Sequence, residues 1–184
     1  KYMAANMMTF TPVDKLNLSV GNSVVYAEDQ PYPGFIIPIA FYKSNDHVTT
    51  KGLGLENQNS QLFFSFSSRN IRNLHLFASV YIDEVQWRRF LPDSPDKNPV
   101  SCKVGARLSN FPVENLSIGG ELTRSNILNY KHSIPALSWA SNSYNMGHYL
   151  GDNSREWYVE MLYKPIRGLD VKLFYLDALK GNEY

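Results

Sequence analysis

The sequence predicts an all-β protein, an antiparallel transmembrane β-barrel with about eight strands in this chain. Two observations predict it: apolar and polar residues alternate along eight segments, and short and long connections alternate between those segments. A period of two gives each strand one apolar face and one polar face. Outer-membrane barrels turn tightly on the periplasmic side and send long loops to the cell exterior, which is the connection pattern found here.

The alternation is clearest in residues 74–82, where the even-numbered positions are apolar and the odd-numbered positions include His75 and Ser79. The same pattern recurs with turn residues between the segments, so that the strands pair as hairpins. The eight expected strands are 2–10, 16–24, 62–67, 74–82, 102–108, 116–123, 157–163 and 169–175.

The connections differ in length according to their place in the chain. The expected hairpin turns are short and cover 11–15, 69–73, 109–115 and 164–168, whereas the connections between hairpins are long and cover 26–60, 84–100 and 125–155. A Greek-key sandwich has no reason to alternate in this way, whereas an outer-membrane barrel does.

The length of the expected strand 157–163 agrees with the thickness of a membrane. Trp157 and Tyr163 lie on one apolar face six residues apart, which is roughly 20 Å along a strand and comparable with an apolar band about 25 Å tall. The two rings would then belong to the two aromatic girdles. The alternative is a soluble sandwich in which both rings are core residues and the charged face meets water.

Composition excludes other classes of protein. The 184 residues suffice for one domain, and 18 basic against 17 acidic residues give no field that would attract nucleic acid. Cys102 is the single cysteine, so it forms no internal disulfide. The apolar run 34–42 is far shorter than a membrane-spanning helix.

The chain begins inside one expected strand and stops after another, so we expect a single domain, 1–184, that is incomplete at both ends.

The sequence offers no catalytic motif, so we expect a protein that is not an enzyme and binds no cofactor. Asp83 and Glu84 are adjacent and would point to opposite faces of a strand, which does not suit a glycosidase. No Gly-x-Ser-x-Gly sequence or phosphate-binding glycine-rich loop occurs. The four histidines are too far apart for a local metal motif, and we expect no metal site, although loops could bring three together. They are His47, His75, His132 and His148.

The long connection 125–155 is the first candidate binding site. It carries aromatic residues together with amide and carboxylate side chains, a combination that can stack on sugar rings and bond their hydroxyl groups. Alternatively, these side chains fold the loop onto itself or into the barrel lumen. The glycan-binding candidates in this loop are Tyr130, Trp139, Tyr144 and Tyr149, with Asn126, Asn129, Asn142, Asn145, Asp152 and Asn153 around them.

A second candidate lies in the connection 84–100. Trp87, Arg88 and Arg89, followed by Phe90, combine cations with aromatic rings. Such a cluster suits an acidic polysaccharide, or equally an arginine stacked on its own neighbour.

Several segments, spread over essentially the whole chain, resemble one family. In their order and spacing the chain is similar to the Wzi-like capsule-assembly and gliding-motility outer-membrane proteins of the Bacteroidetes. The segments are Lys1-Tyr2-Met3-Ala4-Ala5-Asn6, Leu16-Asn17-Leu18-Ser19-Val20-Gly21-Asn22-Ser23-Val24-Val25-Tyr26, Ile37-Pro38-Ile39-Ala40-Phe41-Tyr42-Lys43-Ser44, Tyr81-Ile82-Asp83-Glu84-Val85, Asn129-Tyr130-Lys131-His132 and Gly147-His148-Tyr149-Leu150-Gly151-Asp152-Asn153-Ser154-Arg155-Glu156.

The resemblance implies a bacterial outer-membrane location and a barrel with more strands than eight. It also implies a role in attaching or assembling surface polysaccharide, or in surface motility. The expected partners are outer-membrane lipid and surface polysaccharide, together with other outer-membrane, secretion or motility subunits. Two alternatives stay open: a soluble β-sandwich that binds carbohydrate, and a diffusion porin whose lumenal charges tune permeation.

Overall fold

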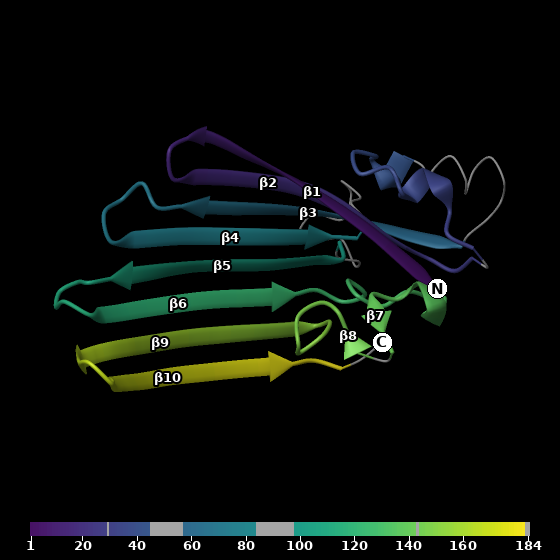
Figure 1. The fold of residues 1–184 in the computed structure, drawn as a ribbon. Helices are drawn as coiled ribbons and strands as arrows, with labels where there is room; N and C mark the ends of the chain where they lie inside the picture. Colours follow the sequence, from purple (N-terminus) through teal and green to yellow (C-terminus); the bar gives the residue numbers. More distant parts are fainter. Residues whose placement is uncertain (29, 45–56, 84–97, 143, 183–184) are drawn as a thin grey trace.

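The computed structural model describes residues 1–28, 30–44, 57–83, 98–142 and 144–182. Figure 1 shows one large antiparallel sheet whose eight strands follow the order β1-β2-β3-β4-β5-β6-β9-β10. The predictions of an all-β fold and of eight antiparallel strands are confirmed. The strands are β1 (Tyr2–Val13), β2 (Leu16–Tyr26), β3 (Gln58–Ser68), β4 (Leu74–Ile82), β5 (Val100–Ser109), β6 (Leu116–Ser125), β9 (Ser154–Ile166) and β10 (Leu169–Lys180).

The sheet is an up-and-down meander, because each of these strands pairs with the next one along the chain. All the hairpin turns lie at one end of the sheet, and the long connections begin and end at the other, where β1 starts and β10 ends (Figure 1). We refer to these as the turn end and the loop end. A short hairpin of β7 (Ala140–Ser141) and β8 (Tyr144–Asn145) within a long connection was not predicted.

Two of the predicted turns are too long. The β1–β2 turn is only 14–15 and the β9–β10 turn only 167–168, so Pro12 and Pro165 lie inside strands. A proline removes one backbone donor and is tolerated on an edge strand or near a bulge. Pro12 meets both conditions, since β1 is an edge strand and its register shifts between Phe10 and Val13.

The sheet is open in the described part of the chain. Strand β1 pairs only with β2, and β10 pairs only with β9. Each of these two strands therefore has one edge whose backbone groups pair with no other described strand.

Strand register collects the apolar side chains on one face. Phe66 lies opposite Ala78, Ala78 opposite Val104, Val104 opposite Leu122, and Leu122 opposite Trp157. Directly opposed residues share a face, so the row is apolar across five strands. This face is uncovered over most of its extent: Val104 is 49% exposed, Val159 46% and Leu173 58%.

The opposite face is polar and carries ion pairs between strands. Lys103 contacts Glu121 at 2.9 Å, while Arg107 and Lys172 contact Glu160 at 2.5 and 3.2 Å. In the described strands, the register leaves three charged residues on the apolar face, all towards the loop end: Arg124, Arg155 and Asp177.

The buried core lies at the loop end, where connections cover both faces of the sheet. Residues of the segment 30–44 pack over the apolar face, where Phe35 and Tyr42 cluster with Val24 and Tyr26. On the polar face, Val25 clusters with aromatic residues of the connection 126–153. No helix in the described ranges is long and apolar enough to cross a membrane.

Two glycines let aromatic rings lie flat across neighbouring strands on the polar face. A Cβ atom at Gly105 would stand 2.4 Å from the ring of Phe77 and 2.9 Å from the carbonyl oxygen of Gly120, and a Cβ at Gly21 would meet the ring of Phe63. At Gly119, on the same face, the nearest atom would be 3.5 Å away, which is ordinary contact.

Gly105→Ala should therefore destabilise the sheet, by about 1–3 kcal/mol as for other overpacked sites, whereas Gly119→Ala should change stability little. A urea titration of the folded protein, followed by tryptophan fluorescence, would measure both. Equal midpoints for the two variants would show that the Phe77 ring does not need the space above Gly105.

Candidate functional site

The connection 126–153 folds back over the polar face of the sheet at the loop end. Two amides of β3 hold it there: Asn59 Nδ2 donates to the carbonyl oxygen of Leu137 at 3.4 Å, and Gln61 Nε2 donates to that of Asn129 at 3.2 Å. Leu137, in the short helix η3 (Pro135–Leu137), is fully buried. The described residues of this connection, 126–142 and 144–153, are therefore an ordered part of the fold.

Lys1, the first residue of the chain, also contacts the connection 126–153. Lys1 Nζ donates to the carbonyl oxygens of Ser138 and Ala140 at 2.8 and 2.7 Å. The start of β1 and the connection 126–153 are thus in direct contact at the loop end, although they are far apart in the sequence.

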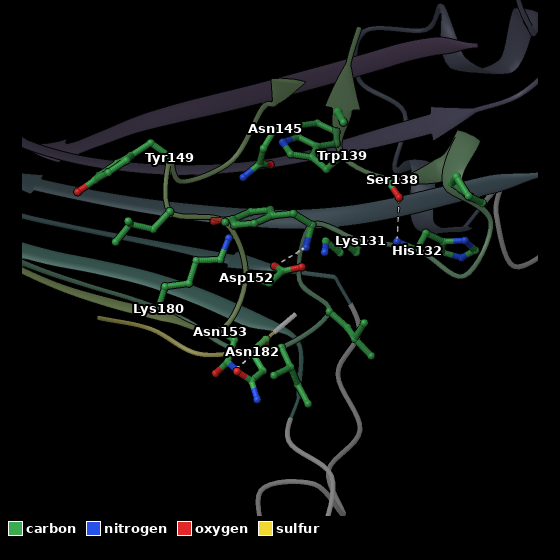
Figure 2. Close-up of a pocket in the computed structure, with 17 residues that line it drawn as sticks. Lys131, His132, Ser138, Trp139, Asn145, Tyr149, Asp152, Asn153, Lys180 and Asn182 are labelled. Atoms are coloured by element: carbon green, nitrogen blue, oxygen red, sulfur yellow. Dashed lines mark hydrogen bonds between the residues drawn. The ribbon is translucent and has the colours of Figure 1, made fainter. Parts of the chain in front are cut away.

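A cavity of about 440 Å³ lies between this connection and the end of β10. Figure 2 shows it, with Lys180 and Asn182 on the side of β10 and the connection providing the remaining walls. The labelled residues of its lining are Lys131, His132, Ser138, Trp139, Asn145, Tyr149, Asp152, Asn153, Lys180 and Asn182.

The four aromatic candidates of this connection do not form one set. Tyr130 and Trp139 line the cavity but are 7% and 8% exposed, and both rings pack against Tyr81 of β4, with centroids 5.9 and 5.6 Å apart. The backbone N–H of Trp139 also donates to the carbonyl oxygen of Tyr130 at 2.8 Å. These two rings hold the connection onto the sheet, and only part of each borders the cavity.

Tyr149 and Tyr144 are the exposed pair. Tyr149 is 66% exposed and lines the cavity, and its hydroxyl donates to Glu156 at the start of β9. Tyr144, in β8, is 79% exposed and lies outside the cavity lining. The candidates Trp87, Arg88 and Arg89 fall outside the described residues.

Asp152 organises the floor of the cavity. One carboxylate oxygen, Oδ1, accepts the backbone N–H groups of Asn129 at 3.1 Å and Tyr130 at 2.9 Å. Its other oxygen is buried and has no hydrogen-bond partner in the described part of the protein. Burial raises the pKa of Asp152, while the backbone donors and Lys131 act in the opposite direction.

A second polar cluster links the connection to the sheet. His148 Nε2 lies 3.7 Å from Glu156 Oε1, and the rings of His148 and Tyr149 are tilted against each other with centroids 4.8 Å apart. Burial lowers the pKa of His148, and the nearby Glu156 carboxylate opposes this effect. His148 is therefore more readily neutral than an exposed histidine, which suits a hydrogen-bonding role.

Sequence reasoning missed the part that the sheet contributes to the cavity. The predicted last strand ends at Tyr175, whereas β10 continues to Lys180 and brings its ammonium group to the lining. Asp177-Ala178-Leu179-Lys180 lacks a clear alternation, so no pattern identified this extension.

Among the residues that the structure describes, no three histidine, cysteine or acidic side chains come together as a metal site.

Comparison of the chain with protein-family models, curated proteins and solved structures found no match. The site itself is therefore the basis for assigning a function. Its groups are the edges of two buried rings, one exposed ring, two ammonium groups and several amides. Such groups bind polyhydroxylated or anionic ligands by stacking and hydrogen bonding.

Asp152→Ala should loosen the connection 126–153, because two buried backbone N–H groups would lose their acceptor. Hydrogen bonds to charged groups contribute about 1.5–3 kcal/mol, so cleavage of the connection in limited proteolysis should be clearly faster. Asp152→Asn retains an acceptor oxygen at the same place and should be cleaved at nearly the wild-type rate. Equal cleavage of wild type and Asp152→Ala would contradict this role.

The same pair of variants should differ in pH dependence. Because burial raises the pKa of Asp152 above 3.8 in the folded state, its contribution to stability is largest at low pH and falls as the pH rises through the folded value. Protection of the connection against an acid-tolerant protease should therefore decrease as the pH rises from about 3.8 in the wild type. Asp152→Asn should lack this decrease.

Proposed function

We propose that this chain forms part of the wall of an outer-membrane β-barrel whose loop end holds surface polysaccharide. The observation that carries the proposal is the apolar face that extends across the strands with its side chains uncovered. Soluble monomers rarely expose apolar patches larger than a few hundred Å². Lipid is the environment in which such a face is stable, and the polar face then lines the barrel interior.

The boundaries of this face support a membrane band. Along β9 the face runs from Arg155 through Trp157 to Tyr163, and the Lys164–Asp170 ion pair follows at the turn end. Arg155 and Tyr163 are eight residues apart, which is about 26 Å along the strand at 3.3 Å per residue and comparable with the apolar band of known barrels, about 25 Å tall. A charged residue thus bounds the apolar face at the loop end, and the β9–β10 turn, beside the Lys164–Asp170 ion pair of the polar face, bounds it at the other end.

Barrel closure follows from the same environment. A free strand edge in hydrocarbon leaves N–H and C=O groups without partners, each at a cost of several kcal/mol. In this proposal β1 and β10 pair with each other or with further strands, so that both edges are satisfied. The contact between Lys1 and the connection 126–153 is compatible with curvature towards the polar face.

The cavity at the loop end is the proposed polysaccharide site. It combines the exposed ring of Tyr149 with Lys131, Lys180 and amide groups, which favours sugars that carry acidic groups. The resemblance to Wzi-like capsule-assembly and gliding-motility proteins agrees with a surface polysaccharide as ligand.

The alternatives are less compatible with the geometry. A soluble sandwich needs a second layer over its apolar face, and no described residues form a second large sheet there. An open diffusion porin needs a free lumen, whereas the connection 126–153 lies on the polar face at the loop end and buries Leu137, Tyr130 and Trp139 against it. The lumen would be narrowed at this end.

The membrane part of the proposal predicts opposite outcomes for the two faces. Val159→Arg places a charge on the apolar face, where it costs about 2–4 kcal/mol near the midplane, and should reduce barrel assembly. Ser65→Arg, on the polar face and opposite Ser19 and Ser79, should assemble normally. Heat-modifiability on gels of outer-membrane fractions would measure both variants, and greater damage from Ser65→Arg would invert the assigned faces.

The polysaccharide part is tested with two exposed tyrosines. Tyr149→Ala removes a ring from the cavity lining, whereas Tyr144→Ala removes a ring of similar exposure outside it. An aromatic contact is worth about 0.5–1.5 kcal/mol, so Tyr149→Ala should bind the purified surface polysaccharide about twofold to twelvefold more weakly. Tyr144→Ala should bind as wild type.

Binding should be measured with equal amounts of folded protein, and shedding of polysaccharide into the medium should be compared in cells. Tyr149→Phe serves as a further control, because it keeps the ring and loses only the hydroxyl bond to Glu156. Wild-type affinity in Tyr149→Ala would remove the cavity from the proposed function and leave motility or permeation as the remaining roles.

A further inference from the structure

Two arginines stand opposite one another on the apolar face at the loop end of the sheet. Arg124 of β6 is the register partner of Arg155 of β9, so their side chains leave the same face with Cβ atoms about 4.5–5.5 Å apart. Both residues are exposed. Cys102 and Leu179 continue the row on the adjacent strands.

The pair lacks compensation within the described part of the chain. Like charges directly opposite each other destabilise a sheet, yet neither arginine has a carboxylate within ion-pair distance among the described residues. On the polar face, by contrast, Lys103, Arg107 and Lys172 each contact a carboxylate.

One acidic residue lies near the pair. Asp177 of β10 is the register partner of Trp157, which places it diagonal to Arg155 and one row deeper in the apolar face. It makes no ion pair with either arginine in the described structure. Its negative charge repels an anion bound at the arginine pair, so removal of this charge should strengthen anion binding.

A cleft of about 460 Å³ opens beside the two arginines. Asn126 and Asn153 add amide groups to its lining. Two guanidinium groups and nearby amide groups thus border one cleft, a combination that suits an oxyanion.

We propose that Arg124 and Arg155 together bind the phosphate of a lipid headgroup in the outer leaflet of the membrane. This inference rests on the proposed function, because it needs the apolar face to meet lipid. The guanidinium groups lie at the boundary where that face ends and the loops begin, which is the depth of the headgroups. The acyl chains of the lipid then lie along the row that contains Leu122 and Trp157, while the phosphate bonds to the arginines bidentately.

The test is native mass spectrometry of the full chain in maltoside micelles with added lipid A. Arg124→Gln combined with Arg155→Gln should bind diphosphorylated lipid A at least about tenfold more weakly than wild type, because both charge-assisted contacts are lost. Arg72→Gln combined with Arg167→Gln removes the same charge from exposed turns at the opposite end, and should bind as wild type. Asp177→Asn should bind more tightly.

Dephosphorylated lipid A and inorganic phosphate separate the sources of binding. Dephosphorylated lipid should bind wild type and both double variants equally. Equal binding of diphosphorylated lipid by wild type and the Arg124/Arg155 variant would overturn the site. Arginine-dependent binding of inorganic phosphate as tight as that of the lipid would overturn the lipid assignment and leave a soluble anion as ligand.

Two further measurements keep the outcome interpretable. Arg124→Lys combined with Arg155→Lys preserves charge and should bind the lipid with intermediate affinity, which a mere loss of folding would not produce. Membrane fractionation of the wild type tests the proposed function separately. Membrane-inserted protein with arginine-independent lipid binding refutes this inference alone, whereas protein that is soluble without detergent refutes both.

Discussion

The backbone ladder between antiparallel strands is the constraint on which the rest of this structure depends. Because opposed residues share a face, one register across eight strands decides the surroundings of nearly every side chain. A slip of one residue between any two strands would send Val104 or Val159 to the polar face and the Glu160 ion pairs to the apolar face. The turns at one end fix this register, with Lys15 and Gly168 in the left-handed conformation that such tight turns require.

At the loop end, one segment divides its aromatic residues between packing on the sheet and exposure at the cavity. Tyr130 and Trp139 bury their rings against Tyr81 and thereby place the cavity, whereas Tyr149 remains accessible on its wall. Asp152 contributes to both the packing and the cavity, since its carboxylate orders the backbone at Asn129 and Tyr130 and also forms part of the lining. In the proposed function, a ligand at this cavity would meet a surface that is already formed, which lowers the entropy lost on binding.

Charge is distributed according to the same two faces. The polar face neutralises its cations with neighbouring carboxylates, and Glu160 alone receives Arg107, Lys172 and the hydroxyl of Tyr158. Within the described strands, the apolar face has no such network over its central rows, and its charged residues gather at the loop end. In the proposed membrane setting this separation keeps charge out of hydrocarbon and concentrates the uncompensated arginines at headgroup depth.

The sequence by itself determined the strands, their pairing within hairpins and the composition of the two faces, because a period of two is a local property that residues 74–82 or 157–163 already display. It could not determine that Pro12 and Pro165 remain within strands, which depends on edges and bulges. The cavity depends on contacts between distant segments: Asn59 and Gln61 meet the connection 126–153, and Lys180 reaches it from β10. The Arg124–Arg155 pair likewise exists only once β6 and β9 are aligned across the intervening connection, because cross-strand proximity is created by tertiary pairing and leaves no local signal in the chain.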